Sequence, residues 1–325
     1  MAANDQDKLL NALGEIAIPG LDLKLADSGA TIAAEGEGDD WRLRVTLGFP
    51  AAGIAVELGQ ALRRRAAELI GREPELSLDW RIRAHAVQGT LKPLPGVRNI
   101  LAVASGKGGV GKSTTAVNLA LALAAEGAAV GVLDADIYGP SQPTMLGLED
   151  QRPQSRDGKT FEPLEQYGLK VMSIGFLVDR DQAMIWRGPM VTQALQQLMF
   201  QTNWGELDYL VVDLPPGTGD AQLTLTQKIP VSGALIVTTP QDIALMDARR
   251  GLVMFEKVGV QVLGIIENMA SFVCPGCGQE TFLFGEGGGA ALSAESEVPL
   301  LGQLPLDLKI RLQADSGRPT VVAEP

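Results

Sequence analysis

A glycine-rich segment in the first half of the chain carries the residue types of a phosphate-binding loop. It satisfies the pattern G-x-x-x-x-G-K-[ST] with Gly106-Lys107-Gly108-Gly109-Val110-Gly111-Lys112-Ser113. Glycines let backbone N–H groups turn inward around phosphates, where side chains would block them. We expect Lys112 to reach the β- and γ-phosphates and the Ser113 hydroxyl to bind Mg²⁺, and we count Thr114 among the nucleotide-binding residues. The segment predicts binding and hydrolysis of a nucleoside triphosphate, with ATP as the expected nucleotide.

Three aspartates follow apolar runs that are typical of buried strands. Asp134 and Asp136 follow one run, and Asp213 closes another, Tyr209-Leu210-Val211-Val212. The carboxyl ends of parallel strands border the ligand crevice of an open sheet, so these side chains can face the triphosphate. For Asp134, we expect a role in fixing the end of the strand or in the metal shell. Asp213 then matches the Walker B carboxylate that holds Mg²⁺ through water, and Gly217 offers a backbone N–H for the γ-phosphate. Without the glycine-rich loop, Asp134 and Asp136 would be read as turn-forming residues.

The two cysteines of the chain stand together in Cys274-Pro275-Gly276-Cys277. A [4Fe–4S] cluster or a structural zinc site usually takes four ligands, and the only histidine is His85, far away in the sequence. A four-thiolate site therefore requires two chains, as in a symmetric dimer. A dithiol redox switch and an incidental turn are alternatives, and the spacing alone favours zinc and iron–sulfur equally.

The elements that must position these residues follow an alternating pattern after residue 98. Apolar runs alternate with helical patterns, as in βαβ units, and a helix is predicted for residues 112–125. The predicted buried strands span residues 100–104, 129–133, 170–174, 209–212, 234–238, 262–267 and 299–304. The fold class is therefore α/β, a P-loop NTPase with a mostly parallel, doubly wound sheet over residues 99–325.

Residues 1–92 are charged and mixed in composition, unlike the rest of the chain, and they predict a small α+β domain, with residues 93–98 as a linker. Leu43, Val45 and Leu47 alternate with polar residues, residues 54–70 have helical spacing ending at Gly71, and residues 76–86 alternate again.

Composition narrows the function classes. The chain has 325 residues and a formal net charge of −12, which argues against nucleic-acid or anionic-membrane binding. Two cysteines exclude a disulfide framework, and a polar, acidic start is not a secretory signal. The expected location is cytoplasmic.

The loop with its extra lysine, Lys107, resembles the deviant Walker A ATPases. Further motifs make residues 97–320 similar to the Mrp/ApbC/Nbp35 branch of iron–sulfur carriers, namely 136–141 (DIYGPS), 213–220 (DLPPGTGD), 268–269 (NM), the CxxC pair and 284–285 (FG). The resemblance implies an ATP-hydrolysing homodimer that holds a [4Fe–4S] cluster between its subunits, receives it from donors and passes it to apo-proteins.

The same resemblance implies roles for individual residues. Lys107 is expected to act on the nucleotide of the partner subunit, Asp136 to orient the attacking water, and Asn268 to bind the adenine edge. Partition and division ATPases, which position cargo on DNA or membranes, share the loop but lack the CxxC segment. A structural-zinc ATPase is the other alternative.

The N-terminal domain resembles the MIP18-like (DUF59) module of bacterial members. Relatives of that module have a cysteine where this chain reads Gly48-Phe49-Pro50-Ala51-Ala52-Gly53, so partner recognition is expected here rather than metal binding. Members of the branch usually continue into one more helix beyond the position of Pro325, so no role of a C-terminal helix, membrane attachment included, is expected from this sequence.

Overall fold

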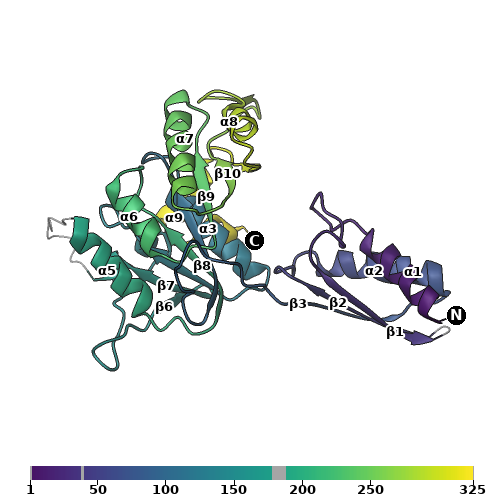
Figure 1. Ribbon diagram of the computed structural model, residues 1–325. Coiled ribbons are helices and arrows are strands. Elements are labelled where there is room, and N and C mark those ends of the chain that lie inside the picture. The colour runs from purple at the N-terminus through teal and green to yellow at the C-terminus, as the bar shows by residue number, and fades with distance from the viewer. Residues whose placement is uncertain (1, 38–39, 178–187, 325) are drawn as a thin grey trace. The chain divides into compact units, whose positions relative to one another are not determined.

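A computed structural model describes residues 2–37, 40–177 and 188–324 of the chain (Figure 1). The chain divides into two compact units. One unit comprises Met1–Arg83 together with Ala125–Ala128, and the other comprises Ala84–Ala124 together with Ala129–Pro325.

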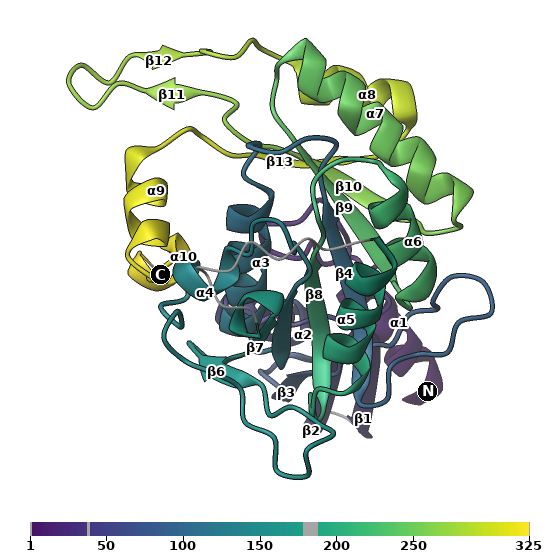
Figure 2. The same cartoon turned by 90° about the vertical axis from the view of Figure 1, so that its left-hand side faces the viewer.

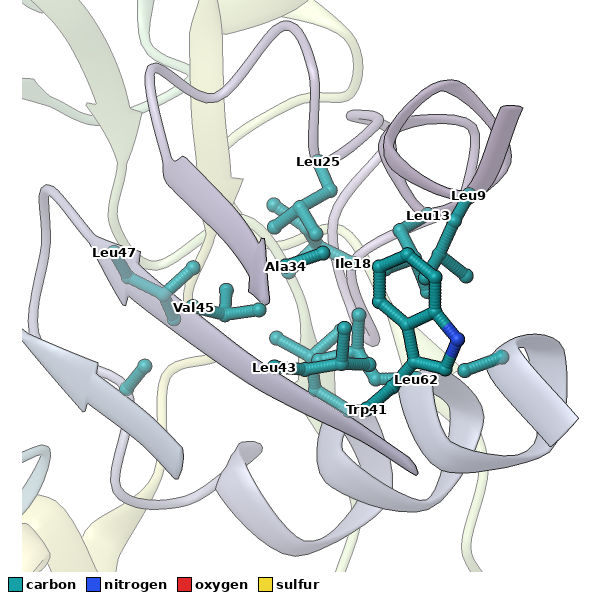
Figure 3. Close-up of a cluster of buried hydrophobic side chains, with 13 residues drawn as sticks. Leu9, Leu13, Ile18, Leu25, Ala34, Trp41, Leu43, Val45, Leu47 and Leu62 are labelled. Atoms are coloured by element: carbon teal, nitrogen blue, oxygen red, sulfur yellow. The ribbon is translucent and has the colours of Figure 1, made fainter. Parts of the chain in front are cut away.

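The N-terminal unit is a three-stranded sheet with two helices on one face. Strand β2 (Asp40–Leu47) lies between the antiparallel β1 (Thr31–Glu37) and the parallel β3 (Glu75–Trp80). Alternate residues of β2 face the core, where they meet α1 (Ala2–Gly14) and α2 (Ala55–Ile70), as Figure 3 shows. Those core-facing residues of β2 are Trp41, Leu43, Val45 and Leu47. This alternation follows from the two-residue period of a strand, and it leaves the arginines of β2 on the open face.

Two predictions for this unit are confirmed and one needs correction. The strand around residues 43–47 and the helix over 54–70 are present, and Gly71 ends the helix in the left-handed conformation. The strand expected over 76–86 stops at Trp80, because beyond it the backbone pairs only at Arg81 and Arg83, to Leu47 and Gly48.

The second unit contains an eight-stranded sheet in the order β13-β10-β9-β4-β8-β5-β7-β6. All of its strand pairs are parallel except β6 with β7. Its strands are β4 (Val97–Ala104), β5 (Val130–Asp134), β6 (Leu164–Gln166), β7 (Leu169–Ser173), β8 (Leu207–Asp213), β9 (Gly233–Thr238), β10 (Val262–Glu267) and β13 (Leu300–Gln303). This confirms the α/β fold class and all seven predicted strands, to within a few residues at their ends.

Helices cover both faces of this sheet (Figure 2). The crossover helices α5 (Gly188–Phe200), α6 (Asp220–Lys228), α7 (Asp242–Lys257) and α8 (Gly288–Ser296) connect strands in one direction along the sheet and lie on one side. Helix α3 (Lys112–Ala125) connects in the opposite direction and lies on the other side, with α4 (Gln142–Met145), α9 (Leu308–Asp315) and α10 (Thr320–Ala323). Right-handed crossovers require this split, so the direction of chain winding reverses next to β4.

A short hairpin stands apart from these layers. Strands β11 (Phe272–Val273) and β12 (Glu280–Thr281) pair antiparallel and project from the body of the unit (Figure 2). The CxxC motif lies in the turn between them.

The boundary between the units lies earlier than the linker predicted at residues 93–98. Residues after Arg83 bond to the second unit: the His85 N–H donates to Asn99 Oδ1 over 3.0 Å, and Gln88 Nε2 donates to the carbonyl of Thr226 over 2.8 Å. Val97 already begins β4, so the linker overlaps this strand. Within the described residues, every helix is too short or too polar to cross a bilayer.

Candidate functional site

The glycine-rich loop joins the central strand β4 to α3 at the carboxyl edge of the sheet. Gly109 and Gly111 have φ values of +83° and +85°, a region that favours glycine. A Cβ on Gly106 would collide with the backbone of Asp247 in α7, and one on Gly111 would collide with the side chain of Asn268. A Cβ on Gly108 or Gly109 would meet nothing within 4 Å. The loop is thus held tightly at its two ends and open in its middle, as a cradle for phosphates requires.

Lys112 lies at the centre of a buried polar network. Its ammonium pairs with the Asp213 carboxylate and also donates to the Ser113 hydroxyl over 3.2 Å, and its side chain is 6 % exposed. Gln142 completes the network by donating to Asp213 Oδ2 over 2.9 Å and to the carbonyl of Ser113 over 3.1 Å. The structure therefore brings together the three predicted magnesium- and phosphate-binding residues.

Asp134 holds the segment that follows β5. It stands directly opposite Asp213 on the neighbouring strand β8. Its carboxylate accepts hydrogen bonds from the N–H groups of Asp136, Ser141 and Gln142 and from the Ser173 hydroxyl, over 3.0–3.1 Å. Burial, together with the charge of Asp213, raises the pKa of Asp134 to about 7. This carboxylate is an anchor for the 135–142 loop rather than a group exposed to a ligand.

Asp136 lies on that anchored loop. It is 8 % exposed, and its Oδ1 accepts a hydrogen bond from the Gly139 N–H over 3.3 Å. Burial raises the pKa of Asp136, while the positive charge of Lys112 opposes this shift. The carboxylate therefore sits close enough to Lys112 for their charges to interact.

Lys107 and Gly217 make contacts within their own chain. The Lys107 ammonium donates to Gln241 Oε1 over 3.1 Å, at the start of α7. The Gly217 N–H donates to the carbonyl of Ser105 over 2.9 Å, so its predicted contact with a γ-phosphate requires the 214–219 segment to move.

Asn268 lies at the end of β10 beside the glycine-rich loop. Its Nδ2 donates to the Val110 carbonyl over 2.8 Å, and its N–H donates to the Thr238 carbonyl. An adenine that used both groups of this amide would have to replace the bond to Val110. Thr114 lies in the first turn of α3, where its carbonyl accepts a bond from Asn118 over 2.9 Å.

Cys274 and Cys277 occupy the tip of the β11–β12 hairpin. Cys274 is half-buried and Cys277 is exposed, and both are free thiols. Hydrogen bonds from the N–H groups of Gly276 and Cys277, and from the Cys277 side chain, lower the pKa of the Cys274 thiol. A thiol that ionises readily is a good metal ligand. Across the described part of the chain, however, no group of three or more His, Cys, Asp or Glu side chains is placed to hold a metal ion.

Two residues of the site escaped the sequence analysis. Gln142 is 29 residues from Ser113, and Gln241 is 134 residues from Lys107. The one available signal was position: each follows a strand, β5 or β9, at the edge where the glycine-rich loop lies. Glutamine carries no charge pattern that would single it out.

The parallel sheet, the loop between β4 and α3 and the Lys112–Asp213 pair define a P-loop NTPase. Residues 96–325 match the family model described as ParA, NUBPL iron-transfer P-loop NTPase. The chain belongs to this family.

Individual relatives agree with this assignment. The chain is 60% identical over 245 residues to an iron–sulfur cluster carrier protein of Pseudomonas fragi, covering 75% of this chain and 85% of the relative. It is 47% identical over 330 residues to one of Haemophilus influenzae, covering 100% of this chain and 88% of the relative. A solved nucleotide-binding protein from Archaeoglobus fulgidus, in complex with ADP, superimposes with a TM-score of 0.64 at 41% identity, covering 71% of this chain and 91% of that one.

Proposed function

We propose that this chain is an ATP-hydrolysing carrier that holds a [4Fe–4S] cluster between two copies of itself and delivers it to apo-proteins. Names of the relatives and the family model support the carrier role. The single observation that carries the dimer is the ligand count. Each chain offers two thiols on one hairpin tip, and the cluster as cargo takes four.

The donor set at the loop fits a magnesium nucleotide. Ser113 Oγ and the Asp213 carboxylate are hard oxygen ligands of the kind Mg²⁺ prefers, and they are linked through Lys112. Gln142 Oε1, buried beside them, has no hydrogen-bond partner in the structure. Bound Mg²⁺ would neutralise charge on the β- and γ-phosphates.

The chain's own residues would perform the rest of the hydrolysis. Lys112 exchanges Asp213 for the phosphates when the nucleotide binds, and the N–H groups around Gly108 and Gly109 surround the phosphate oxygens. Asp136 orients the attacking water, and Lys107 of the partner subunit stabilises the charge that develops on the transferred phosphoryl group. Gly217 reports the state of the γ-phosphate through its N–H, and Asn268 selects adenine.

Nucleotide state would be transmitted to the cluster through a short path. Asn268, which bonds to the Val110 carbonyl, lies six residues before Cys274 in the sequence. A change in the loop can therefore alter where β10 ends and how the β11–β12 hairpin projects. We also propose that the N-terminal unit is a MIP18-like module that recognises donor or recipient proteins.

Anaerobic reconstitution tests the proposal. The wild type is expected to take up four iron and four sulfide ions per dimer, and Cys274→Ala to take up almost none. Gln279→Ala on the same hairpin is the matched control, because its exposed side chain is two residues from Cys277. Equal iron and sulfide uptake by wild type and Cys274→Ala would contradict the cluster claim. Zinc in both aerobic and anaerobic preparations would favour a structural-zinc ATPase instead.

A further inference from the structure

The start of helix α7 contains a side chain whose position is not explained by helix capping. Gln241 is the N-cap residue of α7, and its side chain makes no cap hydrogen bond. Helices favour Ser, Thr, Asp or Asn at this position, because their short side chains accept bonds from the first N–H groups. The Gln241 amide instead accepts a bond from the Lys107 ammonium over 3.1 Å.

The contact joins two parts of the unit that are held at a fixed spacing. The Gly106 Cα lies so close to the Asp247 backbone in α7 that no Cβ fits between them. Gln241 is six residues before Asp247, on the loop that leads from β9 into the same helix. This close packing of the loop against α7 places the Lys107 ammonium within reach of its acceptor.

The two lysines of the loop are held in different ways. Lys112 is buried and paired with the Asp213 carboxylate. Lys107 is half-buried and bonds to a neutral amide. A bond between an ammonium and a neutral amide at a partly exposed site is weak enough to exchange for an anionic acceptor. Lys107 is thus held reversibly against its own chain.

We propose that Gln241 is a positioning residue that keeps Lys107 on its own subunit until a phosphate of the partner subunit is in reach. The inference rests on the proposed action of Lys107 across a dimer and extends it to a residue outside the loop. The property of Gln241 that matters for this role is that its side chain is polar but uncharged. A carboxylate at the same position would hold Lys107 more tightly, and a methyl group would release it.

Substitutions at position 241 test this directly. Gln241→Glu is expected to lower steady-state ATP turnover by about two- to fivefold, as expected for a partly exposed ion pair. The loss should diminish as salt is raised, because such a pair is screened. Gln241→Ala is expected to equal or exceed the wild-type turnover. Nucleotide affinity and the thermal midpoint should stay unchanged in both variants, which a merely structural role for Gln241 would not predict.

The charge control is Gln261→Glu, which adds the same charge at an exposed residue just before β10, at the end of that strand away from the nucleotide edge. It should behave as the wild type. Unchanged turnover in Gln241→Glu, or a loss that does not respond to salt, would overturn the proposal.

Chemical labelling separates this inference from the dimer mechanism. The rate at which an activated ester acylates Lys107, followed by peptide mass spectrometry of the full chain without nucleotide, should be highest in Gln241→Ala and lowest in Gln241→Glu. Equal rates in all three proteins would overturn the contact itself. If labelling follows this order but Lys107→Ala retains wild-type turnover, the action of Lys107 on the partner fails while the Gln241 contact stands.

Discussion

The nucleotide edge and the cysteine hairpin of the same unit are built in opposite ways. At the nucleotide edge, Lys112, Asp213, Asp134 and Gln142 are buried and joined by side-chain hydrogen bonds. At the hairpin, Cys274 and Cys277 lie in the turn between two strands of two residues each, with one thiol exposed. One chain thus contains an organised phosphate-binding loop, whereas its hairpin offers only two thiols. Under the proposed function, nucleotide binding can begin within a single subunit, whereas cluster binding requires ligands from a second one.

The largest effects on turnover and stability are expected at the nucleotide edge, the more organised of the two regions. Lys112→Ala removes the cation that pairs with Asp213 and is expected to reduce ATP turnover by about 100-fold or more. It also leaves a buried carboxylate unpaired, so the free energy of unfolding should fall by about 3 kcal/mol. Turnover assays and denaturant unfolding measure the two effects. Lys159→Ala, at an exposed loop position, is the control and should change neither. Retention of full stability in Lys112→Ala would mean that the pair contributes little.

A smaller effect is expected at the anchor of the 135–142 loop. Asp134→Asn presents an amide nitrogen to N–H donors that now bond to a carboxylate, at an expected cost of about 1–3 kcal/mol in the free energy of unfolding. Turnover should fall about tenfold, because Asp136 and Gln142 are positioned by the same loop.

The pH dependence of that variant gives a sharper test. Burial raises the pKa of Asp134 from its ordinary 3.8 to about 7, so the folded chain retains a proton that the unfolded chain releases. Stability gained in this way is present at low pH and is lost as the pH rises from about 4 to about 7. The difference in unfolding free energy between wild type and Asp134→Asn should therefore be largest near pH 4 and shrink toward pH 8. A difference that grows with pH would contradict this assignment.

The local parts of the site could be predicted from the sequence, and the contacts between distant segments could not. Helix α3 begins and ends where its pattern predicted, because the glycine-rich loop before it and its helical spacing are both local signals. Asp134 and Asp213 could be placed together, since both close strands that end at one edge of a sheet. The hydrogen bonds of Gln142 and Gln241 depend on which loops the fold brings together. The residues next to them in the sequence give no signal of these long-range contacts.

In the N-terminal unit too, pairing between distant segments limited how well the strands could be predicted from the sequence. Strand β1 (Thr31–Glu37) consists of alanines, glutamates and a glycine besides Thr31 and Ile32, and it was missed because its apolar alternation is weak. Its pairing with β2, rather than its own residues, makes it a strand. Alternation beyond Trp80 in turn predicted a strand where only two backbone bonds form.

Substitutions at two glycines of the loop are expected to affect stability and nucleotide binding separately. Gly111→Ala combines a positive φ with a collision against Asn268, so the free energy of unfolding should fall by about 1–3 kcal/mol. Gly108→Ala meets no atom within 4 Å and should leave stability within about 0.5 kcal/mol of wild type, while weakening ATP binding. Denaturant unfolding and nucleotide titration measure both. Equal destabilisation by the two changes would mean that the middle of the loop is packed rather than open.

The smallest effects on stability and nucleotide affinity are expected at the cysteine hairpin, the less organised of the two regions. Cys277→Ser changes one exposed atom that makes little contact with the core, so unfolding free energy should stay within about 0.5 kcal/mol of wild type. Nucleotide affinity of the cluster-free protein should also be unchanged, because the organised site lies within one chain. Iron uptake should nevertheless be lost, since the proposed dimer would keep two thiols of four. Calorimetry, ATP titration and iron analysis on the same preparation check the three statements. A loss of nucleotide affinity in the cluster-free variant would mean that the hairpin and the phosphate loop are coupled even without the cluster, and the two regions would then not be independent.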